Sequence, residues 1–160
     1  MFLVTNVLDE AVLKQNLEDI LAKYGRVDAL LNAAGGNMPG ATIAPTGTFF
    51  DLKVDEFQKV LNLNLTGTVL PTQVFLKPMV EQKKGAIVNF SSMAAFRPMT
   101  RVCGYAAAKR VFPILLHSWR MRWQQNSVKV FVSMPFVQVQ PWEQNLPKIH
   151  FQLILMKKQC

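Results

Sequence analysis

Two short apolar segments, separated by helical patterns, constrain the fold of this chain more than any other feature of its sequence. Residues 27–31 and residues 86–90 are each typical of a buried strand, and a turn of small or hydroxyl side chains follows each run. Apolar residues before and between these runs recur at the spacing of helices. Strands that alternate with helices form parallel sheets, so we expect an α/β fold with a doubly wound, Rossmann-like parallel sheet.

Local signals place the remaining elements of this fold. Asp9 is a plausible N-cap for the first helix, and Gly25 is expected to end it. Pro71 lies inside the third helical pattern, where a kink is expected. In addition to the two central strands, we expect strands at residues 1–4 and 128–135, and helices at residues 13–24, 54–61 and 65–79.

Tyr105 and Lys109 form the most informative pair of side chains. They are four residues apart, so on a helix both lie on one face, one turn from each other. A free phenol titrates near pH ~10, and a neighbouring ammonium stabilises the phenolate, which favours proton transfer at lower pH. Ser92 directly follows the predicted strand at residues 86–90, and open α/β sheets bind ligands at the C-terminal ends of their strands. The sequence therefore predicts a proton-transfer site made of a serine, a tyrosine and a lysine.

This arrangement resembles the short-chain dehydrogenase/reductase family, whose members move hydride between NAD(P) and a carbonyl/alcohol pair. Two further stretches carry the resemblance. Asn32-Ala33-Ala34-Gly35 looks like the motif that follows the family's fourth strand, and Asn64 matches the family's helix asparagine. The resemblance covers residues 1–109 and fades after Lys109.

The resemblance implies a role for each of these residues. Tyr105 would exchange a proton with the substrate oxygen, and Lys109 would support it and bind the nicotinamide ribose. Ser92 would hydrogen-bond the substrate carbonyl, and Asn64 would hold a water of the proton relay. Asn6 stands where the family has an aspartate that binds adenine, and a turn residue before the helix is the open alternative. The implied catalytic residues are Asn64, Ser92, Tyr105 and Lys109; the implied cofactor-binding residues are Asn6, Asn32, Ala33, Gly35, Tyr105 and Lys109.

Within the family, residues 32–42 and 69–73 look like the bacterial D-mannonate oxidoreductase (fructuronate reductase) branch. The resemblance implies NAD(H) or NADP(H) as the cofactor and the sugar acids D-fructuronate and D-mannonate as the substrate pair, with gluconate and other polyol dehydrogenases as close alternatives. A sugar-acid carboxylate needs a cation, so Arg97 and Arg101 are candidate substrate-binding residues beside Ser92, and solvated loop arginines are the open alternative. The family also implies a homo-oligomer.

Charge and cysteine usage limit the other function classes. Residues 1–109 carry 11 Lys and Arg against 9 Asp and Glu, whereas residues 110–160 carry 7 against one, so most of the formal charge of +8 belongs to the last third. These basic residues are scattered among apolar ones rather than clustered on one face, which argues against nucleic-acid binding. No apolar run reaches the length of a membrane span, and the 2 cysteines have no metal-ligand spacing, so we expect a cytoplasmic protein without a metal site.

Both ends of the chain depart from the family pattern. No glycine precedes Gly25, so the glycine-rich turn that holds the pyrophosphate is not in the sequence, and residues 1–109 are expected to be a core without the first βαβ unit. No glycine follows Gly104, and residues 110–160 are expected to be an atypical tail, either divergent or translated out of frame. We therefore expect impaired cofactor binding and an inactive fragment, with a non-catalytic basic binding protein as the alternative.

Overall fold

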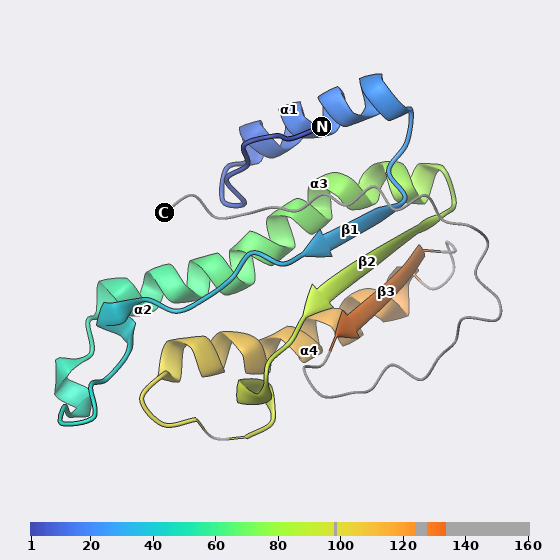
Figure 1. Ribbon diagram of the computed structural model, residues 1–160. Coiled ribbons are helices and arrows are strands. Elements are labelled where there is room, and N and C mark those ends of the chain that lie inside the picture. The colour runs from blue at the N-terminus through green and yellow to red at the C-terminus, as the bar shows by residue number, and fades with distance from the viewer. Residues whose placement is uncertain (98, 124–127, 134–160) are drawn as a thin grey trace.

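The computed structural model describes residues 1–97, 99–123 and 128–133, which form helices and strands in alternation (Figure 1). A π-helix, Asn62–Thr66, joins the second and third helices, and short 3-10 turns lie at Pro39–Ala41, Phe49–Asp51 and Met93–Ala95. The main elements are α1 (Glu10–Tyr24), β1 (Ala29–Asn32), α2 (Val54–Leu61), α3 (Gly67–Glu81), β2 (Gly85–Phe90), α4 (Cys103–Trp123) and β3 (Val128–Ser133).

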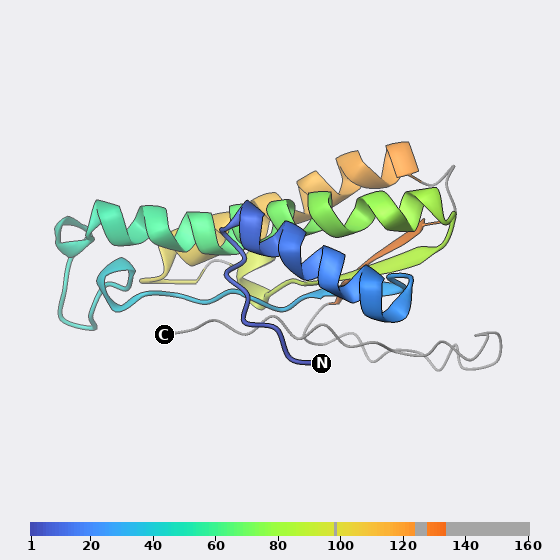
Figure 2. The same ribbon diagram turned by 90° about the horizontal axis from the view of Figure 1, so that it is seen from above.

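The three strands form one parallel sheet in the order β1-β2-β3. Helix α3 connects β1 to β2 and helix α4 connects β2 to β3, as parallel neighbours require. Both connecting helices lie on the same side of the sheet (Figure 2). The described elements therefore form a parallel sheet whose connecting helices cover one face, as in part of a Rossmann-like fold. The predicted α/β fold with an incomplete parallel sheet is confirmed.

Helix α1 begins and ends where its local sequence dictates. The Asp9 carboxylate accepts hydrogen bonds from the backbone N–H groups of Ala11 and Val12, at 3.0 and 3.1 Å, and so caps the first turn. Gly25 ends the helix at a φ of 75°, a left-handed conformation that glycine adopts without a steric penalty. The predicted cap and stop are both confirmed.

The apolar core lies between the sheet and helix α3. Leu30 of β1 and Ile87 of β2 are fully buried, and they belong to the same cluster as Phe75 and Met79 of α3. Helix α1 packs against α3 and adds Leu13 to this cluster. The burial of these side chains fixes α3 against the ends of both strands, which is the framework for the candidate site.

Three regions differ from the sequence-based expectation or extend beyond it. The predicted strand at residues 1–4 is wrong: Phe2 and Val4 are exposed, and no strand of the described part of the chain lies beside this segment to supply backbone hydrogen bonds. Helix α4 continues to Trp123, so the expected domain boundary after residue 109 falls inside one helix. The predicted strand at residues 128–135 forms over Val128–Ser133, and the rest of it, like most of the expected tail, lies outside the described residues.

No helix in the described ranges combines the length and hydropathy needed to cross a membrane.

Candidate active site

Lys109 is the centre of the candidate site. Its side chain is 9% exposed, and its Nζ donates a hydrogen bond of 2.9 Å to the carbonyl oxygen of Phe90, the last residue of β2. The same Nζ lies 5.7 Å from the centre of the Tyr105 ring. The expected pairing of Tyr105 and Lys109 on one face of a helix is thus present, and it lies at the carboxyl end of a strand.

Burial lowers the pKa of the Lys109 ammonium from its ordinary value of 10.5. The protonated form is therefore easier to deprotonate here than on an exposed lysine. The charged form of Lys109 is therefore less favoured at this buried position than in water.

The start of helix α4 is held in place by close packing next to Tyr105. A Cβ atom at Gly104 would lie 2.8 Å from the Phe57 ring of α2, so only glycine allows the two helices to approach this closely. Helix α4 also packs against the 3-10 turn Met93–Ala95, which directly follows Ser92. The contact of α4 with this turn brings the helix that carries Tyr105 close to the segment that begins at Ser92.

Ser92 begins that turn. Its Oγ accepts a hydrogen bond of 3.2 Å from the backbone N–H of Ala94, so the hydroxyl proton is not used in this contact. The side chain is half-buried, and the Oγ of the neighbouring Ser91 is buried without a hydrogen-bond partner among the described residues. Ser92 thus keeps a donor for a ligand, while its predicted contact with a substrate carbonyl stays a prediction.

Asn64 is 1% exposed and connects the π-helix to the loop after β1. Its Nδ2 donates to the carbonyl oxygens of Gly36 and Val60, at 2.7 and 2.8 Å, and its Oδ1 accepts from the N–H of Gly36 at 3.1 Å. The side-chain amide therefore clamps the Gly36 backbone, a function that the sequence did not indicate. The expected role of Asn64 in holding a water stays a prediction.

Gly35 brings the loop after β1 against the candidate catalytic residues. A Cβ atom at this position would lie 2.9 Å from Asn64 Oδ1 and 3.7 Å from Lys109 Nζ. The glycine is itself exposed, as is Ala33 in the same loop. Gly35 thus lies exposed beside Lys109, and Ala33 is exposed two residues earlier in the same loop.

Asn32 differs from Ala33 and Gly35 because its side chain points into the protein. It is 6% exposed, and its Nδ2 donates to Thr72 Oγ1 at 2.9 Å and to Asn89 Oδ1 at 2.8 Å. The side-chain amide is therefore committed to α3 and β2. The expected contact of Asn32 with a cofactor stays a prediction, and the sequence did not single out Thr72 or Asn89 as its partners.

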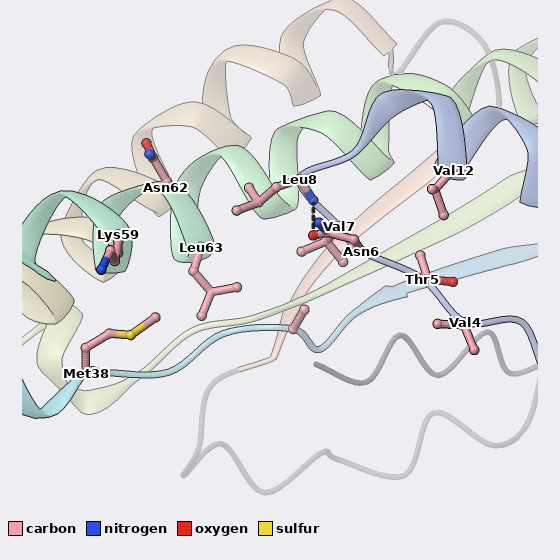
Figure 3. Close-up of a pocket in the computed structure, with 11 residues that line it drawn as sticks. Val4, Thr5, Asn6, Val7, Leu8, Val12, Met38, Lys59, Asn62 and Leu63 are labelled. Atoms are coloured by element: carbon pink, nitrogen blue, oxygen red, sulfur yellow. Dashed lines mark hydrogen bonds between the residues drawn. The ribbon is translucent and has the colours of Figure 1, made fainter. Parts of the chain in front are cut away.

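Asn6 forms the turn before helix α1. Its Oδ1 accepts from the N–H of Leu8 at 3.1 Å, and its carbonyl oxygen accepts from the N–H of Asp9 at 3.1 Å. Asn6 therefore acts as the turn residue before the helix, which was the alternative that the sequence left open. Asn6 also lies in the wall of a cavity of about 520 Å³, between residues 4–8 and the segments that carry Met38 and Leu63 (Figure 3).

Arg97 and Arg101 are both exposed in the loop before Tyr105. Arg101 has a φ of 69°, which is uncommon outside glycine, and its carbonyl oxygen accepts a hydrogen bond of 2.9 Å from the N–H of Ile43. The backbone of Arg101 thus ties the loop before the tyrosine to the loop after β1. The two guanidinium groups stay candidates for binding an anionic substrate.

A parallel α/β fold that carries serine, tyrosine and lysine at the carboxyl end of its second strand defines a class of enzymes that reduce carbonyls or oxidise alcohols. The sequence model described as short chain dehydrogenase matches residues 1–146. The chain belongs to this family. The match extends beyond Lys109, where the recognisable motifs end.

Individual relatives agree with this family. The chain is 44% identical over 112 residues to an uncharacterized oxidoreductase, UxuB, of Bacillus subtilis, covering 65% of this chain and 40% of that protein. It is 33% identical, with a TM-score of 0.73, to a proposed D-mannonate oxidoreductase from Haemophilus influenza with bound NAD, covering 86% of this chain and 54% of that one. A metagenomic short-chain oxidoreductase in complex with NADP is 26% identical, with a TM-score of 0.71, over 82% of this chain and 57% of that one. The chain thus spans about 40% of the length of the Bacillus subtilis relative.

Proposed function

We propose that this chain carries the catalytic part of an NAD(P)-dependent oxidoreductase that acts on the carbonyl group of a sugar acid. The observation that carries the proposal is the position of Lys109, whose Nζ lies 5.7 Å from the centre of the Tyr105 ring and 3.7 Å from where a Gly35 Cβ would be. A buried lysine close to both a phenol ring and the exposed loop after β1 supports the proposal.

The described residues fit the nicotinamide end of the cofactor. Gly35 is exposed beside Lys109, and because it has no Cβ its backbone approaches Asn64 and Lys109 closely. The cavity of about 520 Å³ beside Asn6 is lined mostly by apolar side chains, as a site for the flat adenine ring would be. The glycine-rich turn for the pyrophosphate is not in this sequence, so no residue of the chain is assigned to that group.

The chemistry of the protein side follows from these positions. When bound, the nicotinamide supplies or accepts the hydride. Tyr105 gives a proton to the substrate oxygen during reduction and takes it back during oxidation, and the Lys109 ammonium stabilises the negative charge that this transfer creates on the phenol oxygen. Ser92, which has a hydroxyl proton to donate, orients the carbonyl oxygen.

The sugar-acid substrate has two supports. One is the similarity to the proposed D-mannonate oxidoreductase from Haemophilus influenza, and the other is the pair of exposed arginines, Arg97 and Arg101, in the loop that precedes Tyr105. A guanidinium binds a carboxylate through two parallel hydrogen bonds. We propose D-fructuronate and D-mannonate as the substrate pair, NAD(H) or NADP(H) as the cofactor, a homo-oligomer as the assembly and the cytoplasm as the location.

The proposal is tested by binding as well as by turnover. Because the glycine-rich turn for the pyrophosphate is not in this sequence, we expect weak cofactor binding, in which NADH at high concentration shifts the amide NMR signals of Gly35, Gly36 and Lys109. D-mannonate should shift the signals of Ser92 and Arg101 in the presence of NADH. Tyr105→Phe removes only the phenol oxygen, so it should leave both sets of shifts in place and abolish any reduction of D-fructuronate.

Two results would overturn parts of the proposal. Signals of Gly35 and Lys109 that do not respond to NADH would remove the cofactor assignment. A response to D-gluconate in place of D-mannonate would leave the cofactor assignment intact and reject the proposed substrate.

A further inference from the structure

The buried hydroxyl of Thr72 connects α3 to β1 directly, and through Asn32 to β2. Thr72 is 3% exposed and accepts a hydrogen bond of 2.9 Å from Asn32 Nδ2, at the end of β1. The same hydroxyl donates to the carbonyl oxygen of Thr68 at 2.7 Å, one turn earlier in α3. Asn32 in turn donates to Asn89 Oδ1 of β2 at 2.8 Å. Both hydrogen-bonding functions of the Thr72 hydroxyl are thus used inside the protein.

This polar group lies on the apolar side of the sheet. Asn32 is 6% and Asn89 is 0% exposed, and the same faces of their strands carry the fully buried Leu30 and Ile87. Within the described residues, Asn32 Oδ1 and Asn89 Nδ2 have no hydrogen-bond partner. A buried polar atom without a partner is destabilising, so the group is poorly explained as a device for stability alone.

The same residues stand at the roots of the two loops that make up the candidate site. Asn32 is three residues before Gly35, the glycine that lies against Lys109. Asn89 is three residues before Ser92. The hydroxyl of Thr68 extends the connection along α3 by donating to the carbonyl oxygen of Asn64 at 3.2 Å. One hydrogen-bonded path thus connects both loop roots with the residue that clamps Gly36.

We propose that Thr72 is a positioning residue that sets the carboxyl ends of β1 and β2 relative to each other. It thereby also positions the loop after β1, which carries Gly35, and the segment after β2, which carries Ser92. The inference rests on the proposed function, because the loops matter as a pair only if a cofactor and a substrate meet between them. Thr72 contacts neither ligand in this proposal and acts through Asn32 and Asn89.

The test compares three substitutions in the full chain. Thr72→Val keeps the shape of the side chain and removes the hydroxyl, whereas Thr72→Ser keeps the hydroxyl. Thr66→Val is the matched control, because Thr66 is exposed in the adjoining π-helix. Hydrogen exchange is measured at the amides of Ala33 and Ala94, which lie just after the two strands, and at Phe75 and Met79 in the core.

We expect Thr72→Val to speed exchange at Ala33 and Ala94 by about fivefold, which corresponds to one net hydrogen bond, with little change at Phe75 and Met79. Thr72→Ser and Thr66→Val should behave like the unmodified chain. An equal increase in the exchange rate at all four amides would show that Thr72 contributes only to global stability and would overturn the inference. Unchanged exchange rates at Ala33 and Ala94 would also overturn it.

A second measurement separates this inference from the proposed function. Thr72→Val should weaken binding of NADH by about fivefold, again the equivalent of one hydrogen bond, and leave binding of AMP unchanged, because AMP would occupy only the cavity beside Asn6. An equal loss of binding affinity for NADH and for AMP would contradict the inference. If the unmodified chain binds neither ligand, the proposed function fails, while the exchange pattern still decides the role of Thr72.

Discussion

Substitution of Asn64 by alanine should destabilise the chain measurably, because its side chain holds the loop after β1 in place. The side chain makes three hydrogen bonds, at 2.7, 2.8 and 3.1 Å, and two of them hold the backbone of Gly36. Asn64 itself is 1% exposed, so its loss also opens a small cavity beneath the loop after β1.

The expected magnitude follows from the number of bonds. Each net hydrogen bond contributes about 1 kcal/mol, so three contribute about 3 kcal/mol. Gly36 is half-buried, and water can replace part of what its N–H and carbonyl lose. We therefore expect Asn64→Ala to lower the free energy of unfolding by about 2 kcal/mol, between the value for one bond and the value for all three.

Urea unfolding followed by circular dichroism measures this loss, and Asn62→Ala is the matched control. Asn62 lies in the same π-helix, is exposed, and accepts one side-chain hydrogen bond of 3.2 Å from Gln58. Its substitution should change the free energy of unfolding by no more than about 0.5 kcal/mol, as is usual for surface positions. Equal midpoints for the two variants would refute the clamp as a stabilising element.

Two further predictions concern residues of the site. Because burial lowers the pKa of Lys109, its charged form is disfavoured in the folded chain, and its destabilising contribution is fully present below the folded pKa and absent above 10.5. The free energy of unfolding should therefore rise between these two values, and Lys109→Met should remove that rise in urea titrations at several pH values. Gly35→Ala would bring a Cβ to 2.9 Å from Asn64 Oδ1, so it should weaken NADH binding, measured by fluorescence titration. Gly25→Ala, where nothing lies within 4 Å of the added Cβ, should lower stability and leave that binding unchanged, and equal binding losses would contradict the assignment of Gly35.

The sequence predicted those parts of the fold that depend on neighbouring residues. The cap at Asp9 and the stop at Gly25 act within one turn of a helix, so their residue types were enough to locate both ends of α1. The spacing of Tyr105 and Lys109 was likewise sufficient to predict that they lie together, because two residues four positions apart on a helix share a face.

The interior contacts could not be predicted because their partners are far apart in the sequence. Asn64 lies 28 residues from Gly36, and Asn32 lies 57 residues from Asn89. Residue type shows that an asparagine can make several hydrogen bonds, but not which backbone it will meet. The expected strand at residues 1–4 failed for a related reason: an apolar run becomes a strand only beside another strand, and none in the described part of the chain adjoins it.

The facing asparagines of the sheet have a consequence for strand alignment during folding. Asn32 and Asn89 are direct partners in the parallel pairing of β1 with β2. The other residues on these faces, Leu30 and Ile87, are apolar and would tolerate a neighbour of similar size. A slip of two residues would keep every side chain on its own face but set the Asn32 amide against Ile87, where it would lose the Asn89 oxygen. The polar pair thus distinguishes one alignment from its closest competitors, as a single buried asparagine does between paired helices of a coiled coil.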